Sequence, residues 1–452
     1  MEEVKITKEF ISTLKKAIED QNSKLTLELL EDLHPADIAE IFPILEIEDQ
    51  PYLISLFDNE IAADVLLELE EEDRGKILQL LSPKEIADGF ITEMDTDDAV
   101  DVIGELSRRK QSEIISQLED KEHAQDIVEL LRYAEDTAGG LMRKEYVVVN
   151  KNWNAISAIR QMRRQATEME QVYSIYVVDD NNVLLGILSL KKLLTISSNT
   201  RLEEVYDSKV HYVQLNDKDV EVANKIQKYD LMEIPVVDEL KQLHGVITVD
   251  DILDVVRDEA DENYQLAAGI TRPVAPNDNI WALTKARLPW LLIGMFGGLG
   301  AGSIIQKYED ALELVYGLVF FIPLIQSTAG NVGIQSSAIM VQGLANGTIN
   351  GKVLNRLGKE FLLALLNGTG IAAIVLVISH FVFGTTFITS IAIIIALITV
   401  IINAALIGTF IPIFLNNRGI DPAVSTGPFI TTSNDVLGVF IYFVVAKLIL
   451  GV

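Results

Sequence analysis

The hydrophobic pattern divides the chain into a long mixed-polarity part and a strongly apolar C-terminal part. Before residue 284, apolar positions recur in short runs between charged residues. After it, each apolar stretch is close to or longer than the roughly 20 residues that a helix needs to cross a bilayer. The pattern therefore predicts five transmembrane helices behind a large soluble region. The five stretches lie at about 287–306, 312–344, 359–384, 386–415 and 422–450.

The first 132 residues have the spacing of short amphipathic helices. An acid-Ile-Ala unit recurs at steps of 23 and 25 residues, and a Leu/Ile/Phe stripe follows each of the first two units. Ser82-Pro83 has the signature of a helix start, with a hydroxyl cap and Pro in the first turn. A repeat of this period predicts a small α-superhelix. The three units are Asp37-Ile38-Ala39, Glu60-Ile61-Ala62 and Glu85-Ile86-Ala87.

A β-rich pattern begins near residue 145 and occurs twice. Two apolar runs flank a turn at 179–182, and a similar pair flanks the turn at 238–242. Aligning Gly186 with Gly245 gives a period of 59 residues. Two β–β–α repeats are therefore expected. A charged helix is predicted from Asp250 towards Glu262, followed by a linker.

Charge is distributed as unevenly as hydrophobicity. The chain has 66 acidic and 37 basic residues, yet only six of the acids lie beyond residue 284. So acidic a soluble region does not suit nucleic acid or an anionic lipid surface, which need Lys/Arg clusters. It suits cations, although an acidic surface that only confers solubility is the alternative.

The sequence lacks the residues that several classes of enzyme require. There are no cysteines, and the five histidines are scattered without a pair at helical ligand spacing, which disfavours thiolate sites and zinc hydrolysis. The sequence contains neither a phosphate-binding Gly loop ending in Lys-Ser/Thr nor a nucleophile triad. We therefore expect no enzyme and no ATP-driven pump.

Basic residues between the apolar stretches predict the orientation in the membrane. They precede the first stretch and lie between the second and third and between the fourth and fifth, as at Lys285, Arg287, Arg356, Lys359 and Arg418. By the positive-inside rule, the N-terminal region is cytoplasmic and the C-terminus lies outside. The expected location is the plasma membrane, with multiple passes.

Asp435 is the most informative residue, because it lies near the middle of the last apolar stretch. A lone Asp there costs about 2.5–3.5 kcal/mol to insert, so it usually faces a bundle interior or a water-filled path. Thr431, Thr432 and Gly438 are one turn away on the same helical face. A carboxylate among oxygen donors suits a largely hydrated Mg²⁺ ion. The alternatives are an interhelical hydrogen bond and a proton relay.

The second apolar stretch has a polar stripe and a glycine-rich motif, Gly330-Asn331-Val332-Gly333-Ile334-Gln335. Ser327, Asn331, Gln335 and Gln342 follow helical spacing. With Asp435 nearby, the stripe favours a pore lining over simple helix packing. The glycines of the first stretch are expected to pack helices instead.

The 59-residue repeat, with its recurring Gly-x-x-Ser/Thr motif, resembles a pair of cystathionine-β-synthase (CBS) domains. The whole chain resembles the MgtE family of magnesium channels, through Asp136-Thr137-Ala138-Gly139-Gly140-Leu141-Met142, Gly330-Asn331-x-Gly-x-Gln335 and Asn434-Asp435-Val436-x-Gly438. The resemblance implies a multidomain membrane protein with an α-helical superhelical N-terminal domain, a tandem α+β CBS pair, a connecting helix and a five-helix transmembrane domain. The corresponding ranges are 1–135, 136–256 (CBS repeats at about 138–200 and 201–256), 257–283 and 284–452.

The resemblance also implies a homodimer in the bilayer with the ion path between protomers and Asp435 as its central carboxylate. It implies that Mg²⁺ bridges soluble acids and closes the channel when cytosolic Mg²⁺ is high. The pore candidates are Asp435, Asn331, Thr431, Thr432, Gly330 and Gln335. The regulatory candidates are Asp95, Asp97, Asp98, Asp101, Asp230, Asp250, Asp251, Asp254, Asp258, Glu259 and Glu262.

CBS pairs often bind adenosine nucleotides, so ATP is a second candidate ligand, through Thr248, Asp251 and Ser189. Two departures argue against it: Lys192 stands where a ribose-binding Asp is expected, and Ser174 where relatives carry an aromatic residue. The leading hypothesis is an inward Mg²⁺ channel. An exchanger coupled to Na⁺ or H⁺ and a membrane-anchored metal sensor are the alternatives.

Overall fold

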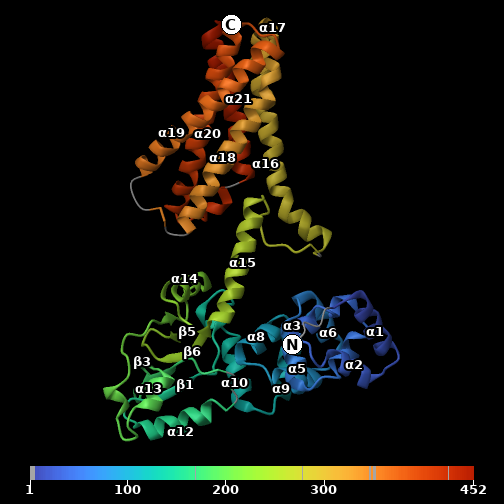
Figure 1. Ribbon diagram of the computed structural model, residues 1–452, viewed down its shortest axis with the longest axis vertical. Coiled ribbons are helices and arrows are strands. Elements are labelled where there is room, and N and C mark those ends of the chain that lie inside the picture. Colours follow the sequence, from blue (N-terminus) through green and yellow to red (C-terminus); the bar gives the residue numbers. More distant parts are fainter. Residues whose placement is uncertain are drawn as a thin grey trace. The chain divides into compact units, whose positions relative to one another are not determined.

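The computed structural model describes residues 6–167, 169, 171–276, 278–345, 348–349, 353–425 and 427–451. It consists of two compact units, Met1–Val256 and Arg257–Val452 (Figure 1). The division falls within the long helix α15 (Val249–Ala267), whose start agrees with the charged helix expected from Asp250.

Short helices make up the first half of the N-terminal unit. Apolar residues on one side of each helix form a common core, as the stripes predicted. The helix start at Ser82 is confirmed, because the Ser82 hydroxyl accepts from the Glu85 amide and the Glu85 carboxylate accepts from the Ser82 amide. The helices are α1 Lys8–Glu19, α2 Ser23–Leu30, α3 Pro35–Ala39, α4 Gln50–Ile54, α5 Asn59–Leu67, α6 Glu71–Leu80, α7 Pro83–Ile86, α8 Thr96–Gly104, α9 Arg108–Gln117 and α10 Lys121–Leu130.

Two small sheets of three strands follow, in the orders β1-β2-β3 and β4-β5-β6. In each sheet the first pair is parallel and the second antiparallel. Gly186 pairs with Val177 and Gly245 with Val236, so the predicted 59-residue period relates equivalent positions of the two sheets. The short strand β4 and the parallel pairing were not predicted. The elements are α11 Ala138–Leu141, β1 Val147–Asn150, α12 Ala155–Gln165, β2 Ile175–Val178, β3 Leu184–Leu188, α13 Leu190–Thr195, β4 Val213–Gln214, α14 Asp219–Tyr229, β5 Glu233–Val237 and β6 Leu243–Thr248.

The second repeat shares its hydrophobic core with the N-terminal helices. Ile234, Ile247 and Ile252 belong to the same buried cluster as Val102 and Ile103 of α8. The first repeat has a core of its own. The start of α15 is therefore built into the same packed body as α8, and the position of its first acids is fixed.

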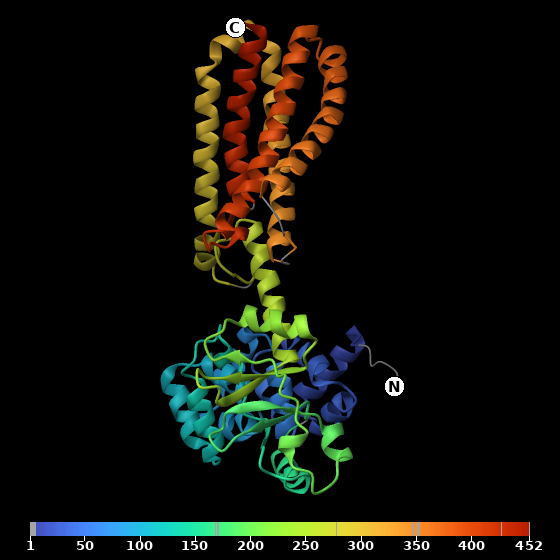
Figure 2. The same cartoon turned by 90° about the vertical axis from the view of Figure 1, so that its left-hand side faces the viewer.

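The C-terminal unit contains five helical segments long and apolar enough to cross a membrane among the residues described (Figure 2). This confirms the predicted number. The central helix α20 is the most buried, whereas α16 is almost entirely exposed. The second span begins only at Tyr316, because a separate short helix precedes it. The helices are α16 Ile280–Lys307, α17 Glu309–Leu314, α18 Ile322–Ala345, α19 Val353–Val377, α20 Phe387–Asn416 and α21 Pro428–Leu450.

Candidate functional site

Helices α18 and α21 lie against each other at two glycines of the predicted motif. A Cβ added at Gly333 would overlap the Asn434 side chain. A Cβ at Gly330 would lie 3.2 Å from the Thr431 methyl carbon and 3.9 Å from Asp435 Oδ1. The absence of side chains on α18 therefore gives room to Thr431, Asn434 and Asp435 of α21. This is the close backbone approach that small residues allow in membrane helices.

Asn434, the residue before Asp435, stabilises the contact between α21 and α18. Asn434 is 1% exposed, and its side-chain amide donates to the Ala329 carbonyl at 3.4 Å. Further along α21, the Tyr442 hydroxyl donates to the Leu318 carbonyl at 2.9 Å. These two bonds join α21 to Ala329 of α18 and to Leu318, which precedes α18, and they fix the rotation of α21. The direction of the Asp435 side chain is therefore set by packing.

Asp435 itself is half-buried, and no hydrogen bond or ion pair to it is recorded within the described part of the chain. A carboxylate at this depth of an apolar helix is costly unless water, a cation or another protein group solvates it. A water molecule or a cation beside this carboxylate would therefore be favourable.

The polar stripe of α18 faces outward. Ser327, Asn331, Gln335 and Gln342 are all exposed, whereas Ala329, Gly330, Gly333 and Met340 on the other side are buried. Amide side chains facing lipid would be left without partners, which is unfavourable in hydrocarbon. The arrangement is that expected of a surface that meets water or a second copy.

The predicted pore residues fall into three groups. Gly330, Thr431 and Asp435 lie together, whereas Asn331 and Gln335 are on the exposed face of the same helix. Thr432 packs differently, because its methyl group fills the space left by Gly297 of α16. This contact agrees with the expectation that glycines of the first span serve packing.

In the N-terminal unit, α8 and the start of α15 bring carboxylates together. Asp97 is only 7% exposed, and burial, followed by the nearby charge of Asp251, raises its pKa well above the usual range. The same two causes raise the pKa of Asp98 to about 7. Burial also raises the pKa of Asp251, against the hydrogen bonds from Thr248. The pKa shifts mean that burial and the neighbouring negative charges disfavour the ionised forms of this acidic cluster, Asp97, Asp98 and Asp251.

Arg143 is the counter-charge that sequence reasoning missed. Its guanidinium is 2.7 Å from Asp95 Oδ2, and it also lowers the pKa of Asp97 and Asp98. Next to it, the Thr96 hydroxyl donates to Glu145 at 2.8 Å and accepts from the Lys144 amide. The only available signal was the position of Arg143, directly after the Asp136–Met142 motif.

The remaining predicted acids are more dispersed. Asp101 is exposed on α8, with Arg74 nearby. Asp250 borders a small cavity of about 60 Å³ that Asp95 and Arg143 also line. Asp230 is exposed at the end of α14, in a left-handed conformation. The others lie on α15, where Asp254, Asp258 and Glu262 are exposed and Glu259 is half-buried.

A resident metal would have to be held by few protein ligands. Among the described residues, no group of three or more His, Cys, Asp or Glu side chains is arranged to hold a metal ion. The donor atoms are nevertheless carboxylate oxygens, which Mg²⁺ prefers, and Mg²⁺ commonly keeps several waters and uses one or two carboxylates. Asp97, Asp98 and Asp251 therefore fit a hydrated Mg²⁺ ion better than a fully protein-ligated one.

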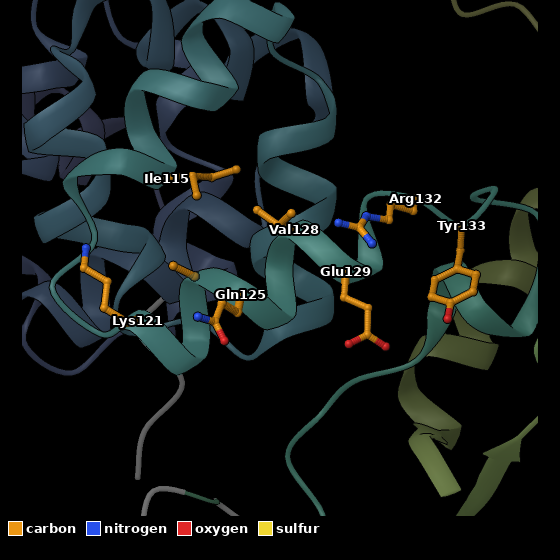
Figure 3. A pocket seen from close by; sticks show the side chains of 8 residues that line it. Ile115, Lys121, Gln125, Val128, Glu129, Arg132 and Tyr133 are labelled. Atoms are coloured by element: carbon orange, nitrogen blue, oxygen red, sulfur yellow. The ribbon is translucent and has the colours of Figure 1, made fainter. Parts of the chain in front are cut away.

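The nucleotide candidates have structural partners. The Ser189 hydroxyl caps α13 by accepting from the Lys192 amide at 3.3 Å. Thr248 is fully buried, and its hydroxyl donates to Asp251 Oδ2 at 2.7 Å. A cavity of about 620 Å³ lies instead beside α10 (Figure 3). It is lined by Ile115, Lys121, Ala124, Gln125, Val128, Glu129, Arg132 and Tyr133, none of them a predicted site residue.

Fold and site together define a membrane protein with five spans, a polar helix face beside an intramembrane carboxylate, and a soluble acidic body. Family models match residues 322–445 (divalent cation transporter), 33–136 (MgtE intracellular N domain), and 138–199 and 202–258 (CBS domain). The magnesium transporter MgtE of Thermus thermophilus is 32% identical over 97% of this chain and 98% of its own length. That of Enterococcus faecalis is 33% identical over 95% and 97%. The chain belongs to the MgtE family.

Solved structures agree for the soluble part. The soluble part of a magnesium transporter matches with a TM-score of 0.50 and 32% identity, covering 56% of this chain and 98% of its own. The cytosolic domain of the Mg²⁺ channel MgtE in complex with ATP matches with a TM-score of 0.51 and 33% identity, covering 54% and 99%. The expected superhelical domain and CBS pair are thereby confirmed.

The raised pKa values predict how stability depends on pH. An unfolded Asp titrates near about 3.9, whereas Asp98 titrates at about 7 in the fold. The native state therefore binds more protons between these values, so stability falls as the pH rises from about 4 to 7 and stays reduced above it. Asp98→Asn should stabilise the Mg²⁺-free protein at pH 8, by on the order of 2 kcal/mol, and progressively less towards pH 5.

Thermal melting of the full-length protein in chelator, at pH 5, 6.5 and 8, measures this difference. Glu93→Gln, at an exposed acid near α8, is the matched control and should leave the pH profile unchanged. A stabilisation by Asp98→Asn that is equal at all three pH values would contradict the assignment.

Proposed function

We propose that this protein carries Mg²⁺ into the cell through a channel that cytosolic Mg²⁺ closes. The observation that carries the proposal is the outward polar face of α18, Asn331 and Gln335, beside the half-buried Asp435. The relatives from Thermus thermophilus, Bacillus subtilis and Enterococcus faecalis, each named as a magnesium transporter, support Mg²⁺ as the substrate.

The pathway is proposed to lie between two copies of the chain in the bilayer. Because the polar face of α18 points out of the single bundle, a second copy placed against it would enclose that face and Asp435 in a wet channel. Mg²⁺ dehydrates reluctantly, so we expect it to pass with much of its water shell. Asp435 would attract the ion, while Asn331, Gln335 and Thr431 would hydrogen-bond its waters, and Gly330, which has no side chain, would let Asp435 lie close to α18.

The membrane potential is sufficient to drive the flux. With the N-terminal region in the cytoplasm, as the basic loops predict, entry is favoured by about 2.3 kcal/mol per charge per 100 mV, hence about 4.6 for a divalent ion. An ATP hydrolysis site is then unnecessary. An exchanger would differ in its reversal potential, which would not follow the Mg²⁺ gradient.

For gating, we propose that the acidic cluster of Asp97, Asp98 and Asp251 acts as the sensor. Without a cation, the carboxylates repel one another, which weakens the contact between α8 and the start of α15. A bound Mg²⁺ would remove that repulsion and stabilise the closed arrangement. Asp95, Asp101, Asp230 and Asp250, together with Asp254, Asp258, Glu259 and Glu262 on α15, are proposed to contribute further negative potential.

The proposed domain limits remain 1–135, 136–256, 257–283 and 284–452. ATP is proposed as a second ligand of the CBS pair, on the ground that the structural relative was solved with ATP. To contact ATP, the Thr248 hydroxyl would have to break its hydrogen bond to Asp251.

Replacing the intramembrane carboxylate should strongly reduce transport. Asp435→Asn should lower Mg²⁺ flux by at least roughly 10-fold, because even at an effective dielectric of 20 a unit charge pair at about 4 Å contributes ~4 kcal/mol. The assay is Mg²⁺ uptake into proteoliposomes under an imposed potential. Asp310→Asn, at an exposed acid of α17, is the control and should conduct normally.

Normal uptake by Asp435→Asn would contradict the channel proposal. A sensor that transports nothing would instead show no uptake in the wild type.

Cation-dependent closure should be visible to a protease. We expect Mg²⁺ at millimolar concentration to slow cleavage at the junction near Asp98 and Asp251, since the bound ion holds these segments together. Asp98→Asn with Asp251→Asn should make cleavage independent of Mg²⁺, whereas Glu93→Gln should not. Equal cleavage of the wild type in chelator and in Mg²⁺ would rule out this sensor.

A further inference from the structure

Glu360 is a second carboxylate inside the membrane-spanning helices. The five spans contain only two acidic residues, Asp435 and Glu360. The sequence pattern placed Glu360 at the edge of the third apolar stretch, but α19 begins earlier, at Val353. Glu360 is therefore about 10 Å along the helix from its first residue. It directly follows Lys359, so it lies near the cytoplasmic end of this span, where its half-buried carboxylate needs a polar partner.

The partner of Glu360 is on the helix that carries the polar stripe. The Ser336 hydroxyl of α18, itself only 5% exposed, donates to Glu360 Oε1 at 2.5 Å. Gly408 of α20 packs against the same part of α18, where an added Cβ would lie 3.1 Å from the Ser336 Cβ and would overlap the Gly333 carbonyl. The missing side chain at Gly408 therefore allows α20 to lie close to α18 beside Ser336.

The bond fixes the rotation of α18. Ser336 directly follows Gln335, and an α-helix has 3.6 residues per turn, so adjacent side chains point in different directions. When the Ser336 side chain is held inward, the Gln335 side chain is therefore directed outward. Gly333, one turn earlier, contacts Asn434 of α21. Ser336 and Gly333 thus hold the buried face of α18 from two sides, and Asn331 and Gln335 are presented on the opposite face.

We propose that Glu360 is a positioning residue for the cation pathway: by accepting the Ser336 hydrogen bond, it holds α18 in the rotation that turns its polar face towards the path. The inference rests on the proposed transport function. It assigns to Glu360 no contact with the ion. What it needs from the side chain is an acceptor oxygen at the end of a two-carbon arm, which Gln also has.

The test is Mg²⁺ flux in proteoliposomes for the full-length variants Glu360→Gln, Glu360→Ala, Ser336→Ala and the double alanine variant. Interhelical hydrogen bonds in membranes contribute enough for a change of roughly 3- to 20-fold. We expect such a loss for each alanine variant, no additional loss in the double variant, and near-normal flux for Glu360→Gln. Thr369→Ala is the control on α19, because that hydroxyl bonds only one turn back, to the Leu366 carbonyl, among the contacts recorded for it.

A second measurement separates positioning from mere stability. The chain has no cysteine, so Ala338→Cys adds a single thiol on the exposed face of α18. Its reaction rate with a water-soluble cationic thiol reagent should change in the Ser336→Ala and Glu360→Ala backgrounds and stay constant with Glu360→Gln and Thr369→Ala. A role limited to stability would change the melting temperature and leave this rate unaltered.

Two outcomes overturn the inference while leaving transport itself intact. In the first, Glu360→Ala has the same flux as the wild type. In the second, Glu360→Gln loses as much flux as Glu360→Ala. Absence of flux in the wild type would instead refute the proposed function, so the two failures are distinguishable.

Discussion

The cost of an unsolvated carboxylate in a bilayer is the constraint on which the membrane part depends. Asp435 is half-buried on α21, and a Cβ added at Gly330 of α18 would lie 3.9 Å from its Oδ1 atom. Packing at Gly330 and Gly333, together with the Asn434 and Tyr442 hydrogen bonds, leaves it little freedom to turn away. The fold therefore maintains an unfavourable charge at a fixed place, which is reasonable only where a cation or water compensates for it.

The soluble body uses the same physical principle in a different setting. Asp97, Asp98 and Asp251 are brought together by a shared hydrophobic core, with Arg143 as an incomplete counter-charge. In the membrane, uncompensated charge would attract the ion that is transported. In the soluble part, it would make the packing of α8 against α15 responsive to that ion. One chemistry, hard oxygen ligands for a hydrated divalent cation, accounts for both.

Sequence patterns predicted those features that depend on local periodicity. The five spans, the start of α7 at Ser82-Pro83 and the 59-residue repeat follow from the spacing of apolar and turn residues, and the structure has them. Asp435 was conspicuous because a charge inside an apolar run is rare. Each of these signals can be read from the spacing of residues along the sequence.

Features that join distant segments could not be predicted in this way. Arg143 reaches Asp95 across 48 residues, and Ser336 reaches Glu360 across 24. The position of Thr432 against Gly297 depends on how α16 packs on α21, which no periodicity specifies. The sequence identified which helix face of α18 is polar, but only packing decides that this face points out of the bundle.

The central claim is that the outward face of α18, beside Asp435, lines a wet path completed by a second copy. Cross-linking in native membranes with a short bifunctional thiol reagent tests it directly, since the chain has no cysteine of its own. A thiol at Gln335 on this face should give covalent dimers, whereas one at Ile374, which is 63% exposed on α19, should give monomers. Dimers at Ile374 with none at Gln335 would place the polar face against lipid and contradict the account.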